Sequence, residues 1–225
     1  MAYGYNRRQE NYVPTDLKMG DSPMAIGRPR EFDTEKALDL AMELFWRKGY
    51  EGTSLSDLTG TLGITRPSLY AAFGNKEALF RKVLDRYDNG PCAYVPKALQ
   101  APTARAVAEQ LLRGAVSLFS DERNPKGCLS VQGALASGDA ADAVREDLIA
   151  RRVAGEEAIY QRLKRAKSEG DLPADSNPAD LAHYIRAVIY GMAVQAAGGA
   201  SRKDLSRVAQ IALRQWPDSR KVRRG

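Results

Sequence analysis

The sequence has few of the side chains on which catalysis and metal binding most often depend. Its 225 residues include one histidine, His183, and two cysteines, Cys92 and Cys128. A catalytic Cys–His pair would need one of these cysteines to meet that histidine in the fold. The chain also lacks a His/Cys/Asp/Glu cluster at metal-ligand spacing and a glycine-rich phosphate loop. We therefore predict that the protein is not an enzyme and has no cofactor and no metal site.

Long apolar runs are missing as well. No run approaches the ~20 residues that a membrane-spanning helix requires, and residues 1–23 lack the apolar core of a secretory signal. These absences predict a cytoplasmic protein with no membrane partner. The two cysteines lie far apart in the sequence and form no disulfide framework, so we expect two reduced thiols.

The net charge of +6 is unevenly distributed along the chain. Residues 24–90 contain ten Lys/Arg and ten Asp/Glu, whereas residues 214–225 contain five basic residues and one acid. Most of the excess therefore belongs to a basic C-terminal tail. Net charge alone is weak support for nucleic-acid binding, and the placement of individual residues has to decide the question.

Strand-type alternation is absent, whereas helical spacing of apolar residues recurs from residue 33 to 216. The sequence predicts an all-α protein. Residues 1–26 are polar and without periodicity, which predicts a disordered extension. We expect a helix-turn-helix DNA-binding domain over 27–74, a larger helical domain over 75–217 and the tail over 218–225.

The first four predicted helices have clear start and stop signals. Asp33 can cap a helix that ends at Gly49, and Ser54 with Asp57 forms a capping box for a second helix through Leu62. Gly63 permits a sharp turn, after which Thr65 caps a third helix. Two short helices joined by a glycine turn and braced by another helix form the helix-turn-helix arrangement. The predicted ranges are 34–48, 55–62, 66–73 and 76–88.

The third helix carries polar residues where a recognition helix meets DNA. Arg66 and Ser68 lie in its first turn, where Arg66 can donate a bidentate pair to guanine and Ser68 can donate or accept. Tyr70 follows one turn later and can reach a phosphate, whereas Leu69 and Phe73 should point into the core. Lys76 opens the next helix, where the helix dipole gives its ammonium no benefit, so a phosphate explains its position better.

Three further residues are candidate contacts to the DNA backbone or groove. Thr53 precedes the second helix and can act as a cap or a phosphate ligand. Arg28 and Arg30 lie in an arm before the first helix, which suits a minor groove or the backbone. Each residue alone is compatible with an ordinary solvated surface. Together, in register with a helix-turn-helix, they favour DNA binding.

Residues 27–80 resemble the N-terminal domain of the TetR/AcrR family of bacterial transcriptional regulators. The resemblance is carried by "GYEGTS", "LTGTLGIT" and "SLYAAFGNKEALF", in this order. It implies a homodimeric all-helical repressor whose C-terminal domain binds a small-molecule effector and then releases a palindromic operator. It makes Arg66, Pro67 and Ser68 the base-reading region, and Thr53, Thr65, Tyr70 and Lys76 the backbone contacts.

The chain departs from the family's pattern after its Leu-Tyr pair. Many members carry His, Tyr or Arg at the next two positions, where this chain has Ala71 and Ala72. Base specificity is then expected to depend on Arg66 and Ser68, with a possible thymine methyl contact from Ala71.

In the second half we expect helices over 103–119, 128–137, 139–169, 178–197 and 201–216. The last two are strongly apolar on one face and can fill a protomer core or form a four-helix dimer interface, and the upstream helix-turn-helix favours the dimer. The residues predicted for the dimer interface are Ile185, Val188, Ile189, Met192, Leu205, Val208, Ala212 and Trp216.

The second half resembles the family's effector domains less specifically, through "KGCLSVQGALAS" and "LAHYIRAVIYGMAVQAAGGASRKDL". The resemblance places the effector pocket among the middle helices, with Phe119, Cys128, Leu135, Tyr160 and Met192 as candidates, although simple core is the more common role for each. Two alternatives remain open. Cys128 can sense oxidants or electrophiles, as cysteines of some relatives do, and the regulator can be an activator instead of a repressor.

Overall fold

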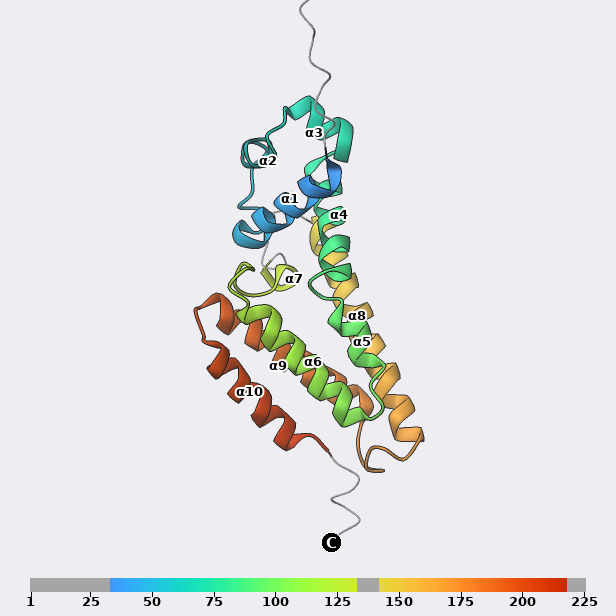
Figure 1. Cartoon of the computed structure of the whole chain (residues 1–225). Coiled ribbons are helices and arrows are strands. Elements are labelled where there is room, and N and C mark those ends of the chain that lie inside the picture. Colours follow the sequence, from blue (N-terminus) through green and yellow to red (C-terminus); the bar gives the residue numbers. More distant parts are fainter. Residues whose placement is uncertain (1–32, 133–141, 218–225) are drawn as a thin grey trace, which may run out of the picture. The chain divides into compact units, whose positions relative to one another are not determined.

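The chain folds into α-helices throughout the residues that the computed structural model describes, 33–132 and 142–217, and these residues contain no strand. They all belong to one compact unit that starts at Asp33. The predicted all-α fold class is confirmed. The helices, labelled in Figure 1, are α1 (Thr34–Lys48), α2 (Leu55–Leu62), α3 (Arg66–Phe73), α4 (Lys76–Asn89), α5 (Tyr94–Leu99), α6 (Ala104–Ser120), α7 (Leu129–Gln132), α8 (Asp142–Ser168), α9 (Pro178–Ala197) and α10 (Arg202–Gln215).

The first three helices begin at the predicted caps. The Asp33 carboxylate accepts from the Lys36 amide, and Thr65 Oγ1 accepts from the Ser68 amide. Ser54 and Asp57 exchange both bonds of a capping box. Gly63 ends α2 in the left-handed conformation, with φ of 65°, which residues with a side chain rarely adopt. Local sequence therefore sets the helix-turn-helix geometry.

A shared apolar core fixes α3 against the other N-terminal helices. Leu58 of α2 and Leu69 of α3 are fully buried, and the rings of Phe45 in α1 and Phe80 in α4 meet edge to face at 4.9 Å. Full burial of such side chains stabilises the fold by ~1.5–3 kcal/mol each. The recognition helix is therefore held by packing, because α3 is too short to be stable alone.

In the second half, α6 lies against α5, α9 and α10, and α8 packs along α9. Arg162 of α8 is buried and donates to the carbonyl oxygens of Leu99 at 3.1 Å and Ala101 at 2.7 Å. These bonds satisfy carbonyls at the end of α5, which lack helical partners. They attach α8 to the segment that leads into α6.

Helix α5, which follows Asn89-Gly90-Pro91, was not predicted from the sequence. Pro96 lies in the first turn of α5, where its missing N–H costs little. Of the predicted helix over 128–137, the structure describes only the part that forms α7, because residues 133–141 lie outside the described part. The predicted extension over 1–26 and tail over 218–225 also lie outside it.

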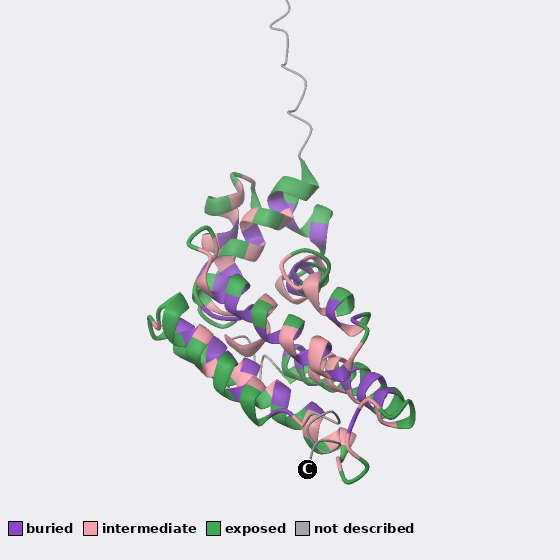
Figure 2. Ribbon diagram, turned by 60° about the horizontal axis from the view of Figure 1, so that its bottom comes forward, coloured by how far each residue is buried: buried purple, intermediate pink, exposed green. Residues whose placement is uncertain are grey.

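The structure places most of the predicted dimer-interface residues in the core of the protomer. Six of the eight are buried within the single protomer, where α9 and α10 pack against α6 and each other, so they cannot form an outer contact surface; these are Ile185, Ile189, Met192, Leu205, Ala212 and Trp216. Val188 and Val208 are half-buried. The large apolar side chains that α9 and α10 expose are Tyr184 (37% exposed), Val194 (58%) and Ile211 (52%). Figure 2 shows these helices with buried and exposed positions on different faces.

Candidate nucleic-acid interface and effector pocket

Helix α3 divides its residues between two faces. Arg66, Pro67, Ser68 and the Tyr70 side chain are exposed, with Tyr70 47% exposed, as are Ala71 and Ala72. Leu69 and Phe73 are buried, as the sequence predicted. The polar residues of the first turn and the two alanines therefore form an open surface, which fits a helix that enters the major groove.

The side chains of the first turn are partly pre-ordered. The hydroxyls of Thr65 and Ser68 lie 2.9 Å apart within hydrogen-bonding distance. Arg66 Nη2 donates to Ser56 Oγ in the first turn of α2 at 3.1 Å. Ser56 was not singled out in the sequence, because nothing local connects it to a residue ten positions later. Its contact lets α2 hold the Arg66 guanidinium, which has no carboxylate partner among the described residues.

Lys76 lies at the start of α4, next to the aromatic ring of Tyr50. Its Nζ is 4.3 Å from the ring centroid, a cation–π contact. Burial lowers the pKa of the Lys76 ammonium, and the charge of Glu51 opposes this shift. The ring therefore positions the amine but supplies no negative charge, so a phosphate remains a suitable partner.

Thr53 has a structural role in this conformation. Its side chain is fully buried, and its hydroxyl donates to the Gly49 carbonyl at 2.7 Å. The predicted phosphate contact of Thr53 would need this side chain to become accessible, so it stays a prediction. Arg28 and Arg30 lie outside the described residues, and their expected DNA contacts also stay predictions.

Two hydrogen bonds connect the N-terminal helices to the loop before α7. Trp46 Nε1 of α1 donates to the Gly127 carbonyl at 3.2 Å. The Tyr87 hydroxyl of α4 donates to Cys128 Sγ at 3.4 Å. The rings of Trp46 and Tyr87 meet edge to face at 4.8 Å, so both bonds belong to one buried cluster.

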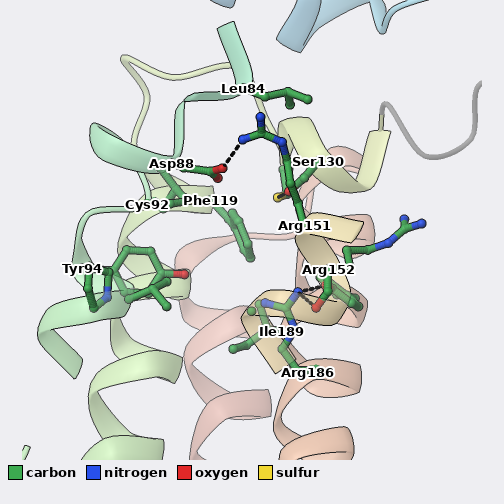
Figure 3. Close-up of a pocket in the computed structure, with 16 residues that line it drawn as sticks. Leu84, Asp88, Cys92, Tyr94, Phe119, Ser130, Arg151, Arg152, Arg186 and Ile189 are labelled. Atoms are coloured by element: carbon green, nitrogen blue, oxygen red, sulfur yellow. Dashed lines mark hydrogen bonds and ion pairs between the residues drawn. The ribbon is translucent and has the colours of Figure 1, made fainter. Parts of the chain in front are cut away.

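A cavity of about 330 Å³ lies next to this cluster, among α4, α5, α6, α8 and α9. Its size is at the lower end of the ~300–1,000 Å³ usual for ligand pockets. Figure 3 shows the side chains of its wall. The residues that matter for its chemistry are Cys92, Tyr94, Phe119, Cys128, Arg186 and Ile189.

Glycine 114 shapes one wall of this cavity. A Cβ on Gly114 of α6 would lie 2.0 Å from the ring of Tyr94, so only glycine lets this ring lie against α6. Burial raises the pKa of the Tyr94 phenol and of the Cys92 thiol well above their usual values. Both groups are therefore neutral near pH 7.

The structure brings together only part of the predicted pocket. Phe119 and Cys128 line the cavity. Met192 is fully buried in the core and Tyr160 lies beside a separate hollow on α8 and α9, so this cavity does not include these two candidates. Leu135 lies outside the described residues. Cys92, Tyr94 and Arg186 were missed, because the folding of four helices brings them together and no sequence spacing does.

His183 pairs with an acid, and the described part of the chain contains no metal-binding cluster. Nδ1 of His183 lies 2.8 Å from Glu156 on the surface, far along the chain from both cysteines. No group of three or more His, Cys, Asp or Glu side chains could hold a metal ion among these residues. No helix in the same residues has the length and apolar character needed to cross a membrane.

Comparison with known proteins gives one consistent result. Residues 37–83 match the family model of bacterial regulatory proteins of the tetR family, and residues 106–212 match the tetracyclin repressor-like C-terminal domain. The HTH-type transcriptional repressor ComR of Escherichia coli is 34% identical over 194 residues, which cover 85% of this chain and 92% of ComR. The HTH-type transcriptional repressor BdcR of Escherichia coli is 30% identical over 189 residues, which cover 83% of this chain and 90% of BdcR.

Solved structures agree with these relatives. A cysteine mutant of the TetR family transcriptional regulator CifR, solved with 26-bp double-strand operator DNA, is 42% identical and has a TM-score of 0.80. The match covers 84% of this chain and all of that one. The chain is therefore similar in both sequence and fold to a regulator that was solved on its operator DNA.

Proposed function

This chain belongs to the TetR family of bacterial regulatory proteins, and from this membership we propose how its DNA-binding surface and its cavity work together. The protein is a DNA-binding transcriptional regulator that acts as a homodimer on double-stranded operator DNA. We propose that Arg66, Pro67 and Ser68 read bases, that Thr65, Tyr70 and Lys76 contact phosphates, and that Thr53, Arg28 and Arg30 add backbone or groove contacts. The domain boundaries at 27–74 and 75–217 are part of this proposal, as is its place in the cytoplasm.

The cavity is proposed as the effector site, and one observation supports it most. The Gly127–Cys128 segment contributes Cys128 to the cavity and also accepts the hydrogen bond from Trp46 of α1. A ligand that moves Cys128 or the α4 wall would therefore also displace the helices that carry α3. The relatives ComR and BdcR are described as repressors, which supports repression here.

Repression would then depend on the separation of the two recognition helices. In a dimer they must enter major grooves about one helical turn apart, roughly 34 Å. An effector that favours another separation shifts the population away from DNA, and a near-complete switch needs a preference on the order of 5 kcal/mol. Tyr184, Val194 and Ile211, exposed on α9 and α10, are the apolar residues proposed to meet the partner protomer.

The test starts from DNA enriched with the protein from genomic fragments. Binding of an enriched fragment is measured for the wild type and for Ile189→Trp, which should fill the cavity, with Val153→Trp on the exposed face of α8 as control. We expect effector-induced release to be lost only in Ile189→Trp. Equal release by both variants would show that the effector binds elsewhere. A reporter on the same fragment separates repression from activation, because deleting a repressor raises expression.

Thiol sensing through Cys128 is a second candidate. Cys128 is buried at the cavity wall, accepts from Tyr87, and lies 3.1 Å from Ser130 Oγ. A small electrophile that enters the cavity would meet this sulfur. Modification there would disturb the same segment that a reversible ligand disturbs.

A further inference from the structure

Arg186 is a charged group of the cavity wall that has no ion-pair partner among the described residues, and the same holds for Arg152. It comes from α9, and Figure 3 shows its guanidinium at the cavity wall beside α8. Its Nη2 makes a long 3.5 Å contact to the Arg152 carbonyl and a short one to the Tyr190 hydroxyl. Its Nε is buried and has no hydrogen-bond partner. No carboxylate lies within ion-pair distance of it in the described residues.

The nearby acids already have other partners. Arg151 forms ion pairs with Asp85 and Asp88 at 2.6 and 2.8 Å and with Asp147 at 3.1 Å. Glu156 is close enough to act electrostatically on Arg186, but its carboxylate lies 2.8 Å from His183. Asp88 lines the cavity but is already paired with Arg151. Glu156 lines a separate surface hollow on α8 and α9.

The rest of the wall gives Arg186 no anionic neighbour. Burial lowers the pKa of its guanidinium. Burial also keeps the Cys92 thiol and the Tyr94 phenol protonated. Phe119 and Ile189 complete an apolar surface beside the guanidinium. Arg186 as a whole is half-buried, and its buried Nε without a partner destabilises the protein unless something else pairs with it.

We propose that the effector is a small organic carboxylate with an apolar body, and that Arg186 binds its carboxylate. The planar guanidinium matches a carboxylate bidentately, and its unpartnered Nε belongs to the edge that makes such pairs. A cavity of about 330 Å³ with aromatic and aliphatic walls suits a single ring or a short branched chain. This inference rests on the proposed effector site and names its ligand class.

The experiment pairs each acid with its neutral amide. Benzoate, phenylacetate and cinnamate, with the three corresponding amides, are titrated calorimetrically into the full-length wild type and into Arg186→Gln. Arg113→Gln is the control, because it removes one positive charge from the exposed face of α6, outside the cavity. We expect at least one acid to bind tenfold or more tightly than its amide, and this preference to disappear only in Arg186→Gln.

Thermal melting separates ligand binding from a structural role. If Arg186 serves to bind an anion, Arg186→Gln without ligand melts at the same or a higher temperature than the wild type, because a half-buried charge without an ion-pair partner has been removed. A lower melting temperature with an unchanged preference for acids would overturn the proposal, as would tighter binding of the amides or no binding by any acid.

Release of operator DNA tests the proposed function separately. Neutral compounds that bind the cavity and release DNA equally from wild type and Arg186→Gln would overturn the carboxylate proposal and leave the effector site standing. Acids that bind through Arg186 without changing DNA affinity would support the carboxylate proposal and contradict the effector role of the cavity.

Discussion

Trp46 and Gly127 lie 81 residues apart, and the indole Nε1 of the first donates to the carbonyl oxygen of the second at 3.2 Å. This bond joins α1, which packs against α2 of the helix-turn-helix, to the segment that carries Cys128 into the cavity. The Gly127 backbone has φ of 87°, a conformation that favours glycine, and a Cβ there would meet the Gln132 side chain at 2.8 Å. The turn that presents this carbonyl therefore depends on glycine.

We expect Trp46→Phe to weaken the connection while the aromatic packing against Tyr87 largely remains. The lost hydrogen bond leaves a buried carbonyl without its partner, which should lower the free energy of unfolding by ~1–3 kcal/mol. Urea denaturation followed by circular dichroism measures this. Operator affinity without effector should change little, whereas effector-induced release should diminish. Full release by the variant would show that the signal takes another route.

Arg66 and Lys76 should differ in how they affect DNA binding. Arg66→Ala should relax base preference at one operator position by ~1–3 kcal/mol, because it removes a base contact. Lys76→Ala should weaken binding to all sequences and reduce the salt slope by about one, because it removes a phosphate contact. Fluorescence anisotropy on matched and mismatched fragments at several salt concentrations distinguishes them. Unchanged binding by both variants would contradict the assignment of the interface.

Local signals predicted the recognition helix well. The caps Ser54 and Thr65 are local, and the opposite exposure of Leu69 and Tyr70 follows from helical periodicity alone. The cavity was harder to predict, because Cys92 and Arg186 meet only through the packing of α4 and α5 against α8 and α9. Periodicity marks an apolar face but does not say what covers it.

The last two helices show this limit most clearly. Ile185 and Leu205 were predicted to meet a second protomer, but they are covered by helices of their own chain. The exposed residues on the same helices, such as Val194, do not stand out in the sequence. Apolar residues are common on protein surfaces as well as in cores, so the residue type alone does not tell the two apart.

The exposed residues lead to a prediction about assembly. Val194→Glu combined with Ile211→Glu should convert the dimer to monomer, because a charge would be buried in an apolar contact. Val153→Glu on α8, where the side chain is 63% exposed, is the matched control and should remain dimeric. Sedimentation velocity gives the oligomeric state. A double variant that stays dimeric with native helicity would place the interface on another surface.

Gly114→Ala should disturb the cavity wall without touching its polar groups. The new Cβ would overlap the Tyr94 ring, which must shift or lose its packing on α6. Overpacking of this kind costs about 1–3 kcal/mol, which thermal denaturation can detect. Tyr94→Ala should relieve the overlap, so the double variant should lose less stability than the sum of the two single changes. Additive losses would contradict this account of Gly114.

The two cavity cysteines allow a direct comparison of thiol reactivity. Burial raises the pKa of the Cys92 thiol, so this sulfur should remain protonated and react slowly at pH 7 to 8. If Cys128 senses electrophiles, Cys128→Ser should abolish operator release by peroxide or N-ethylmaleimide, and Cys92→Ser should leave it intact. Mass spectrometry of the modified protein would locate the adduct. Release that persists in Cys128→Ser would eliminate the thiol-sensing candidate, and reversible ligand binding in the same cavity would remain as the mechanism. Release lost in Cys92→Ser as well would show that both thiols take part, which the neutral state of Cys92 argues against.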